Sequence, residues 1–198
     1  MGNFNTEKLR SLIDEKGGLA APNRFAVVLP DVTQMISPNA LSERLGPVDP
    51  EDLNLICTSA QLPGKQLNVV SREVGIGTKS VANGQVFTAI NLSFYLTNRY
   101  DIRKYFQHWM NCVVSQDEKD AMFAGYYRNY VKDVTVHQLK RKSDSFDNDK
   151  NGKSQAAYSV TLIDAFPTQM ELVQLNNQAQ SAAMEMTVSL AYKTYKIL

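Results

Sequence analysis

The side chains able to do acid–base, nucleophilic or metal chemistry are few in this sequence of 198 residues. His108 and His137 are its two histidines, and neither has carboxylates at the spacing of a zinc site. Cys57 and Cys112 are its two cysteines, and no C-x-x-C pair occurs, so we expect two reduced thiols, as in a cytosolic product. No family-like spacing links either thiol to a histidine base. The sequence therefore predicts neither an enzyme nor a bound cofactor.

Residues 75–80, GIGTKS, imitate a phosphate-binding loop. That motif has a glycine directly before its lysine, so that backbone N–H groups can surround a phosphate. Here Thr78 stands before Lys79, and no apolar strand leads directly into the segment. We interpret the segment as part of a flexible glycine hairpin rather than a nucleotide site.

Residues 147–152, DNDKNG, match the first half of a calcium-binding loop, with Asp147, Asp149 and Asn151 as candidate ligands. Such a loop ends in a bidentate glutamate at its twelfth position, because calcium needs several hard oxygen ligands. Tyr158 occupies that position here, and no flanking helices are expected. We interpret the segment as a solvated polar turn and expect no resident metal.

Composition and charge limit the class of protein. There are 21 basic and 20 acidic residues, a net charge of +1, whereas a non-specific nucleic-acid binder usually has a basic excess. Hydrophobic residues make up 43% of the chain, enough for a core without disulfides or metals. No apolar run approaches 18 residues, so we expect no membrane-spanning helix. One domain over residues 1–198 is expected.

Alternation of apolar and polar residues predicts the strands of this domain. It is clearest over residues 90–97, where Ile90, Leu92 and Phe94 alternate with Asn91 and Ser93, and where Thr97 follows in the same phase. Such alternation favours an antiparallel over a parallel sheet. Further strands are expected at residues 24–29, 53–60, 131–139, 158–162 and 184–192.

Two helices are expected beside the strands. Residues 101–113 have one apolar stripe that includes Ile102, Phe106 and Trp109, with Asp101 as the expected N-cap and His108 off the stripe. Residues 6–16 predict a short amphipathic helix, which is marginal alone and should therefore dock on something.

The remaining segments are expected to be hairpin or loop. Residues 65–87 predict a long hairpin, in which Gly75 and Gly77 are expected to need conformations that a β-branched side chain resists. Residues 31–52 contain three prolines and are expected to be irregular, and residues 140–155 are expected to form a solvated polar loop.

These elements predict a mainly β fold: an antiparallel β-sandwich or barrel with one packed α-helix and a short N-terminal helix. The second faces of its strands are rich in Ser, Thr, Asn and Gln. Such a face can meet water, or it can line a wide, water-filled bore formed by several subunits.

Short stretches in a consistent order resemble the tail tube proteins of contractile-tailed, T4-like bacteriophages. Residues 18–27, GLAAPNRFAV, are similar to the family's entry into its first strand, with Ala21 in place of the usual arginine. Residues 57–64, CTSAQLPG, resemble its C-x-x-A-x-LP-x-G segment with one residue fewer. The strand and helix ending at Trp109, the AFPT of residues 165–168 and the closing strand of residues 185–192 complete the resemblance.

The resemblance implies a β-sandwich whose sheet joins those of five other copies into a twenty-four-stranded inner barrel, so that rings of six stack into a tube. It implies that the polar face with Asn91, Ser93 and Thr97, or its counterparts in the last strand, faces the bore. It also implies ring-to-ring contacts through the hairpin and the N-terminal segment. The contact residues expected there are Val69, Arg72, Glu73, Gly75, Gly77, Lys79, Phe4 and Leu9.

As partners the resemblance implies the tail sheath protein, the tape measure protein and baseplate tube proteins, with genomic DNA passing through without specific binding. The protein would then be part of the phage tail in the virion, assembled in the host cytoplasm. Two alternatives remain open: a tube-initiating baseplate protein or the tube protein of a related contractile injection or secretion system, and a ligand-binding or enzymatic β-barrel. The last needs an apolar pocket with convergent polar groups, which the sequence does not indicate.

Overall fold

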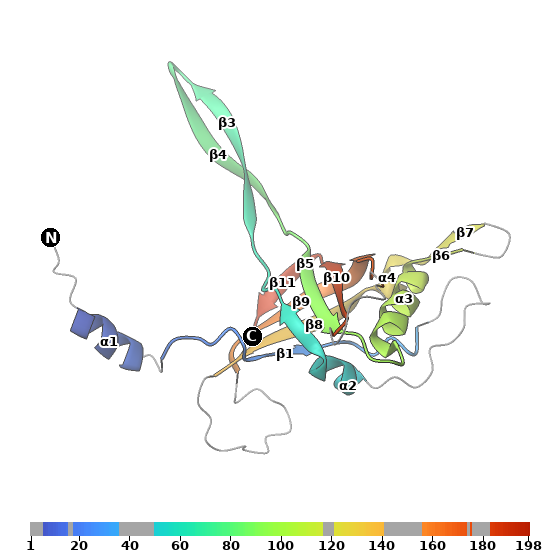
Figure 1. Cartoon of the computed structure of the whole chain (residues 1–198). Coiled ribbons are helices and arrows are strands. Elements are labelled where there is room, and N and C mark those ends of the chain that lie inside the picture. Colours follow the sequence, from blue (N-terminus) through green and yellow to red (C-terminus); the bar gives the residue numbers. More distant parts are fainter. Residues whose placement is uncertain are drawn as a thin grey trace.

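The computed structural model describes residues 6–15, 18–35, 50–116, 121–140, 156–173, 175 and 183–198. Its main sheet consists of β1 (Phe25–Val28), β2 (Cys57–Ala60), β5 (Ile90–Tyr95), β8 (Lys132–Leu139), β9 (Ala156–Met170), β10 (Glu185–Ala191) and β11 (Thr194–Ile197). The order is β1-β8-β9-β10-β5-β2, with β11 also paired to β9, and every pairing is antiparallel (Figure 1). The antiparallel, mainly β fold expected from the alternating residues is confirmed.

The long strand β9 joins the two halves of this sheet because it changes partner along its length. Ile163 pairs with Thr194 of β11, whereas Phe166 pairs with Ala191 of β10. Between them Asp164 has a positive φ of 54°, and its N–H donates a hydrogen bond of 3.2 Å to Asp133 Oδ1. This irregularity lets one strand serve both halves of the sheet.

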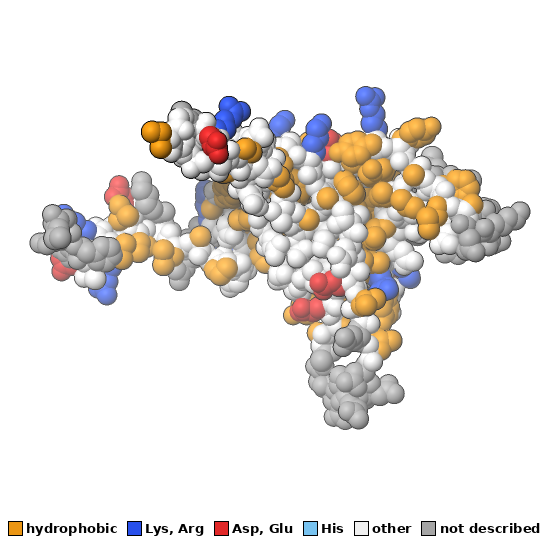
Figure 2. Space-filling view, turned by 90° about the horizontal axis from the view of Figure 1, so that it is seen from above, with side chains coloured by type: hydrophobic (Ala, Val, Ile, Leu, Met, Phe, Trp, Pro, Cys, Tyr) orange, Lys and Arg blue, Asp and Glu red, His pale blue; other side chains and the backbone are white. Residues whose placement is uncertain are grey.

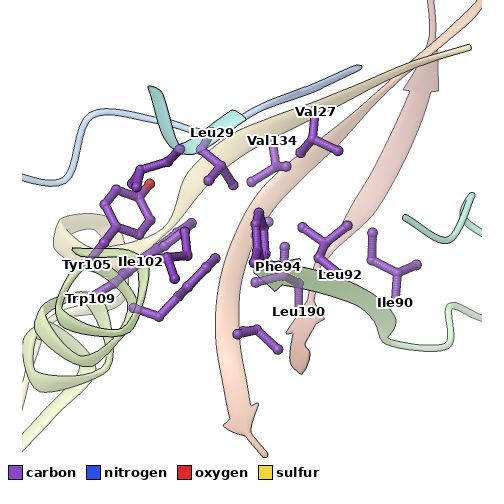
Figure 3. Close-up of a cluster of buried hydrophobic side chains, with 14 of the residues drawn as sticks. Val27, Leu29, Ile90, Leu92, Phe94, Ile102, Tyr105, Trp109, Val134 and Leu190 are labelled. Atoms are coloured by element: carbon purple, nitrogen blue, oxygen red, sulfur yellow. The ribbon is translucent and has the colours of Figure 1, made fainter. Parts of the chain in front are cut away.

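The two halves enclose one hydrophobic core, as expected for a sandwich. Val27 and Val134 project from β1 and β8 toward Phe94 and Leu190 of β5 and β10 (Figure 3). All four side chains are buried. The inward positions are those that the alternation predicts, since successive side chains of a strand point to opposite faces.

Helix α3 (Asp101–Val113) fills one end of this core with its apolar stripe. Ile102, Phe106 and Trp109 are fully buried, as predicted. Two buried polar atoms on the helix are satisfied: Tyr105 Oη donates to Pro30 O at 2.6 Å, and Trp109 Nε1 donates to Tyr130 O at 2.7 Å. The stripe therefore anchors the helix through both packing and hydrogen bonds.

Two expectations for α3 are wrong in detail. Asp101 lies inside the first turn, and the N-cap is Tyr100, which is left-handed at φ 58° and makes no side-chain capping bond. Asp101 instead places a carboxylate at the positive end of the helix dipole. His108, expected off the stripe, is also buried. Strands β9 and β6 and helix α4 all contact α3, so more of the helix surface is covered than the apolar stripe.

The expected boundary between irregular chain and strand at residues 52–53 is also wrong. Helix α2 (Pro50–Leu55) lies there, with Pro50 at its start and Glu51 and Asp52 in its first turn, which are favourable residues for a helix N-terminus. Leu53 is buried while Leu55 is 84% exposed, so the two do not share a strand face. Strand β2 begins later, at Cys57.

The segment after α3 is more ordered than expected. It contains strands β6 (Val114–Gln116) and β7 (Met122–Ala124) and the single-turn helix α4 (Tyr127–Tyr130). Gly125 follows β7, where any Cβ would collide with the carbonyl oxygen of Cys112. The strand predicted at residues 184–192 is confirmed as β10, and β11 is a further strand that the sequence did not predict. The polar loop expected at residues 140–155 and most of that expected at 31–52 lie outside the described residues.

Candidate assembly surfaces

The most prominent surface is a hairpin of β3 (Gln66–Val74) and β4 (Gly77–Val86), which form a sheet of their own. It projects from the body of the molecule (Figure 1). Its described side chains are exposed except for the half-buried Val81. Because an isolated two-stranded hairpin is marginally stable in water, we expect this hairpin to be stabilised by contacts with another molecule. The hairpin expected at residues 65–87 is confirmed.

The pairing register assigns the predicted contact residues to the two faces of the hairpin. Arg72 lies directly opposite Lys79, and Val70 opposite Val81, on one face. The other face has Glu73 opposite Thr78, and Val69, which is 60% exposed, opposite Ala82. Both faces therefore combine exposed apolar and charged side chains. This mixture is typical of a surface that binds another protein.

The two glycines at the hairpin end differ in conformation. Gly75 has a φ of +64° and needs the freedom of glycine in the turn. Gly77 starts β4 without a positive φ, and a Cβ there would meet nothing within 4 Å. The expectation that both glycines need special conformations is therefore right for Gly75 and wrong for Gly77.

Helix α1 (Thr6–Glu15) also has an unpartnered apolar face. None of its residues is buried, and Leu9 and Leu12 are 42% and 53% exposed. Gly18, at φ 90°, ends it by donating from its N–H to Ile13 O at 2.8 Å. The helix is confirmed, but the body of its own chain does not provide the expected docking site. Phe4 lies outside the described residues.

A third apolar surface, which the sequence reasoning missed, lies around β6, β7 and α4. Figure 2 shows hydrophobic side chains gathered toward that side of the molecule. Its most exposed members are Met122, at 75%, and Tyr126, at 83%, with Val114, Phe123 and Tyr127 beside them in sequence. The apolar run of residues 121–127 was the available signal, but without a clear period it did not identify an element.

The predicted bore-facing residues Asn91 and Ser93 lie together on the outward face of β5. Ser93 Oγ is 3.2 Å from Thr187 Oγ1, and Ser189 Oγ donates to Asn91 Oδ1 at 2.7 Å. These four residues of β5 and β10 form what we call the polar strip. All four are half-buried, on the side of the sheet opposite to α3.

Thr97 does not belong to the polar strip. Strand β5 ends at Tyr95, and Thr97 accepts a 2.9 Å hydrogen bond from Tyr100 N–H in the turn that leads into α3. The expectation that Thr97 continues the strand face is wrong, because the turn interrupts the alternation. Its place beside Asn91 and Ser93 is taken by Thr187 and Ser189, the counterparts in the last predicted strand.

The titratable groups of the core are poorly placed for reaction chemistry. Burial raises the pKa of the Cys57 thiol to about 12 and that of Cys112 to about 11. The Cys112 Sγ lies 3.8 Å from Nε2 of the buried His108. Since the thiolate is the nucleophilic form, such raised values make both cysteines unreactive near neutral pH.

His137 and Ser159 form a close histidine–hydroxyl pair, with 2.7 Å between Nδ1 and Oγ. They line a cavity of about 310 Å³ with Tyr158, Leu198 and two alanines. Within the described part of the chain, no three His, Cys, Asp or Glu side chains gather as a metal site. The calcium-like loop with Asp147, Asp149 and Asn151 lies outside that part. Of the described helices, none is long and apolar enough to cross a bilayer.

Comparison with known proteins places this arrangement among tube-forming folds. Residues 20–198 match the family model described as phage tail tube protein. A chain of the anti-feeding prophage tube-terminating cap is similar, with a TM-score of 0.59, 14% identity and coverage of 91% of each chain. No curated protein sequence matches.

Two further structures share the fold. One is a chain of the anti-feeding prophage baseplate, with a TM-score of 0.53, 14% identity and coverage of 91% of this chain and 95% of that one. The other belongs to the sheath–tube complex of the extracellular contractile injection system PVC, with a TM-score of 0.53, 14% identity and coverage of 91% of both chains. The family resemblance inferred from the short sequence stretches is confirmed.

Proposed function

Since this chain belongs to the phage tail tube protein family, we propose that six copies form a ring and that rings stack into the tube of a contractile tail. The family gives the chain a structural role in a tail tube. The observation that supports stacking is the β3–β4 hairpin, which projects without packing on its own body. A projecting element that binds the next copy in one direction gives an open, growing assembly.

The polar strip is the proposed lining of the bore. Its members are neutral hydroxyl and amide groups, two pairs of which are hydrogen-bonded to each other. A lining of this kind lets a nucleic acid pass, because tight binding needs basic side chains that neutralise phosphates. The tube would therefore conduct genomic DNA without specific contacts.

Ring closure would use the ends of the main sheet. Within the described structure, β1 and β2 each pair with a single neighbouring strand, so each has an unpaired edge. Such edges promote uncontrolled pairing unless another strand covers them. We infer that neighbouring copies join at these edges, so that the inner sheet becomes continuous around the ring.

The remaining partners follow from the position of a tube inside a contractile tail. A sheath protein would surround it, a tape measure protein would occupy it during assembly, and baseplate tube proteins would start it. Support comes from the PVC neighbour, which was solved within a sheath–tube complex. We infer a non-enzymatic subunit of the virion that assembles in the host cytoplasm.

Negative-stain electron microscopy of the purified full chain tests this function. We expect six-fold rings and, at high concentration, long tubes. Rings that polymerise only with an added partner would indicate a baseplate initiator instead. A monomer at all concentrations whose melting temperature rises with a small ligand would contradict the structural role.

A further inference from the structure

Arg72 and Lys79 form a basic pair near the end of the hairpin that nothing in the described chain neutralises. They lie directly opposite each other across β3 and β4, so their Cβ atoms are about 5 Å apart. Both are exposed, and neither makes an ion pair with another described residue. Like charges in this position destabilise a hairpin, unless an anion lies between or beside them.

An acidic pair lies at the end of the polar strip. Glu185 begins β10, two residues before Thr187 on the same strand face, and is paired with Tyr95. Glu171 follows β9 and donates its N–H to Thr187 O at 2.9 Å, which places it beside the same residue. Both glutamates are exposed and, within the described chain, have no ion-pair partner.

The basic and acidic pairs lie at opposite ends of β5 and β10. The hairpin is connected through residues 87–89 to the Ile90 end of β5, which pairs with Leu190. Glu185 lies at the other end of the same ladder, beside Tyr95. The hairpin runs away from the body, so Arg72 and Lys79 cannot reach their own acidic pair (Figure 1).

We propose that the basic pair of one copy binds the acidic pair of a second copy in the next ring. The inference rests on the proposed stacking and names the residues that set its direction. Two complementary charge clusters at opposite ends of one subunit favour head-to-tail contact and disfavour head-to-head contact, in which like charges would meet. The ring repeats the contact in every subunit, so exposed pairs that are weak one by one act together.

Charge reversal on each side, and on both sides together, tests the pairing in the full-length chain. One variant carries Arg72→Glu and Lys79→Glu, a second carries Glu171→Lys and Glu185→Lys, and a third carries all four changes. We expect each double variant to raise the critical concentration for tube growth, measured by sedimentation, at least about tenfold. The fourfold variant should return it to within about threefold of the unaltered protein.

Lys65→Glu and Lys196→Glu, combined in one chain, are the matched controls, because they reverse two exposed positive charges at the hairpin base and on β11, outside both charge pairs. They should leave tube growth within about twofold. Added salt should weaken stacking of the unaltered protein and of the fourfold variant alike. Tubes that grow normally in both double variants, or a fourfold variant that fails while its rings persist, would overturn the pairing. An unaltered protein that forms no rings would instead overturn the proposed function.

Discussion

Trp109 is the residue on which the body of the subunit depends most. It is fully buried, lies 6.1 Å from the Tyr105 ring centroid and 6.3 Å from that of Phe106, and donates to Tyr130 O. It thereby packs among the aromatic rings that α3 itself contributes to the core, and its hydrogen bond connects α3 to α4.

Replacement of Trp109 by alanine should lower the free energy of unfolding by about 3–5 kcal/mol, because it removes a large buried side chain and leaves the Tyr130 carbonyl unpaired. Urea denaturation of the monomer measures the change. Leu55→Ala is the control, since Leu55 is 84% exposed and its replacement should cost less than about 0.5 kcal/mol. Equal effects of the two changes would contradict the assigned core.

The two thiols should resist alkylation in the folded protein. Burial raises the pKa of both above the ordinary value of 9.0, so little thiolate exists at pH 8. A thiol reagent should therefore react at pH 8 only after unfolding. Because the folded state holds the two thiol protons more tightly than the unfolded state, the raised pKa values favour folding. This contribution to the free energy of unfolding is complete below pH 9 and is lost as the pH rises toward 11 and 12. Rapid labelling of either thiol in the folded chain at pH 8 would contradict its raised pKa.

At the scale of elements, the hairpin is the part whose disruption should separate folding from assembly. Gly75→Val forces a β-branched side chain into a left-handed turn, at a cost of about 1–2 kcal/mol within the hairpin. No residue of β3 or β4 belongs to the hydrophobic core cluster of the described chain. The melting temperature of the variant should therefore stay within about 2 °C of that of the unaltered protein. Tube growth should fall. Gly77→Val is the matched control and should leave the turn intact, because Gly77 has no positive φ and open space around it.

The elements also show how far the sequence can be interpreted by itself. The stripe of Ile102, Phe106 and Trp109 and the alternation around Leu92 and Phe94 are strong periodic signals, and both predictions are confirmed. Helix α2 has too few residues to establish a period, and its capping residues were hidden within a proline-rich segment.

The parts of the candidate surfaces that the sequence could not predict depend on pairing between distant segments. Thr187 joins Ser93 only through the β5–β10 register, and Glu171 reaches the same place through a bond to Thr187. A pattern within one segment cannot predict which residues of a distant strand will lie beside it. A β-bulge is a second example. Ser189 of β10 pairs with Gln169 and Leu190 pairs with Pro167, so Thr168 of β9 has no partner in the register. Bulges are among the places where a sheet tolerates proline, but the presence of Pro167 did not by itself predict this one.

At the scale of the whole molecule, the subunit is complete in its core and incomplete at its surface. The side chains between the two halves of the sheet are closely covered, whereas the hairpin, α1 and the surface of β6, β7 and α4 expose apolar groups. The polar strip also stays uncovered by α3, which packs against the opposite side of β5 through Phe94. A folded monomer with this many unpartnered surfaces is best explained as a building block.

Cryo-electron microscopy of the assembled protein tests the central claim most directly, because it locates each strand relative to the tube axis. We predict stacked six-fold rings in which Asn91, Ser93, Thr187 and Ser189 line the channel and the β3–β4 hairpin spans the junction between rings. An assembly whose channel is lined by other faces, with these four side chains turned outward or buried between subunits, would contradict the account.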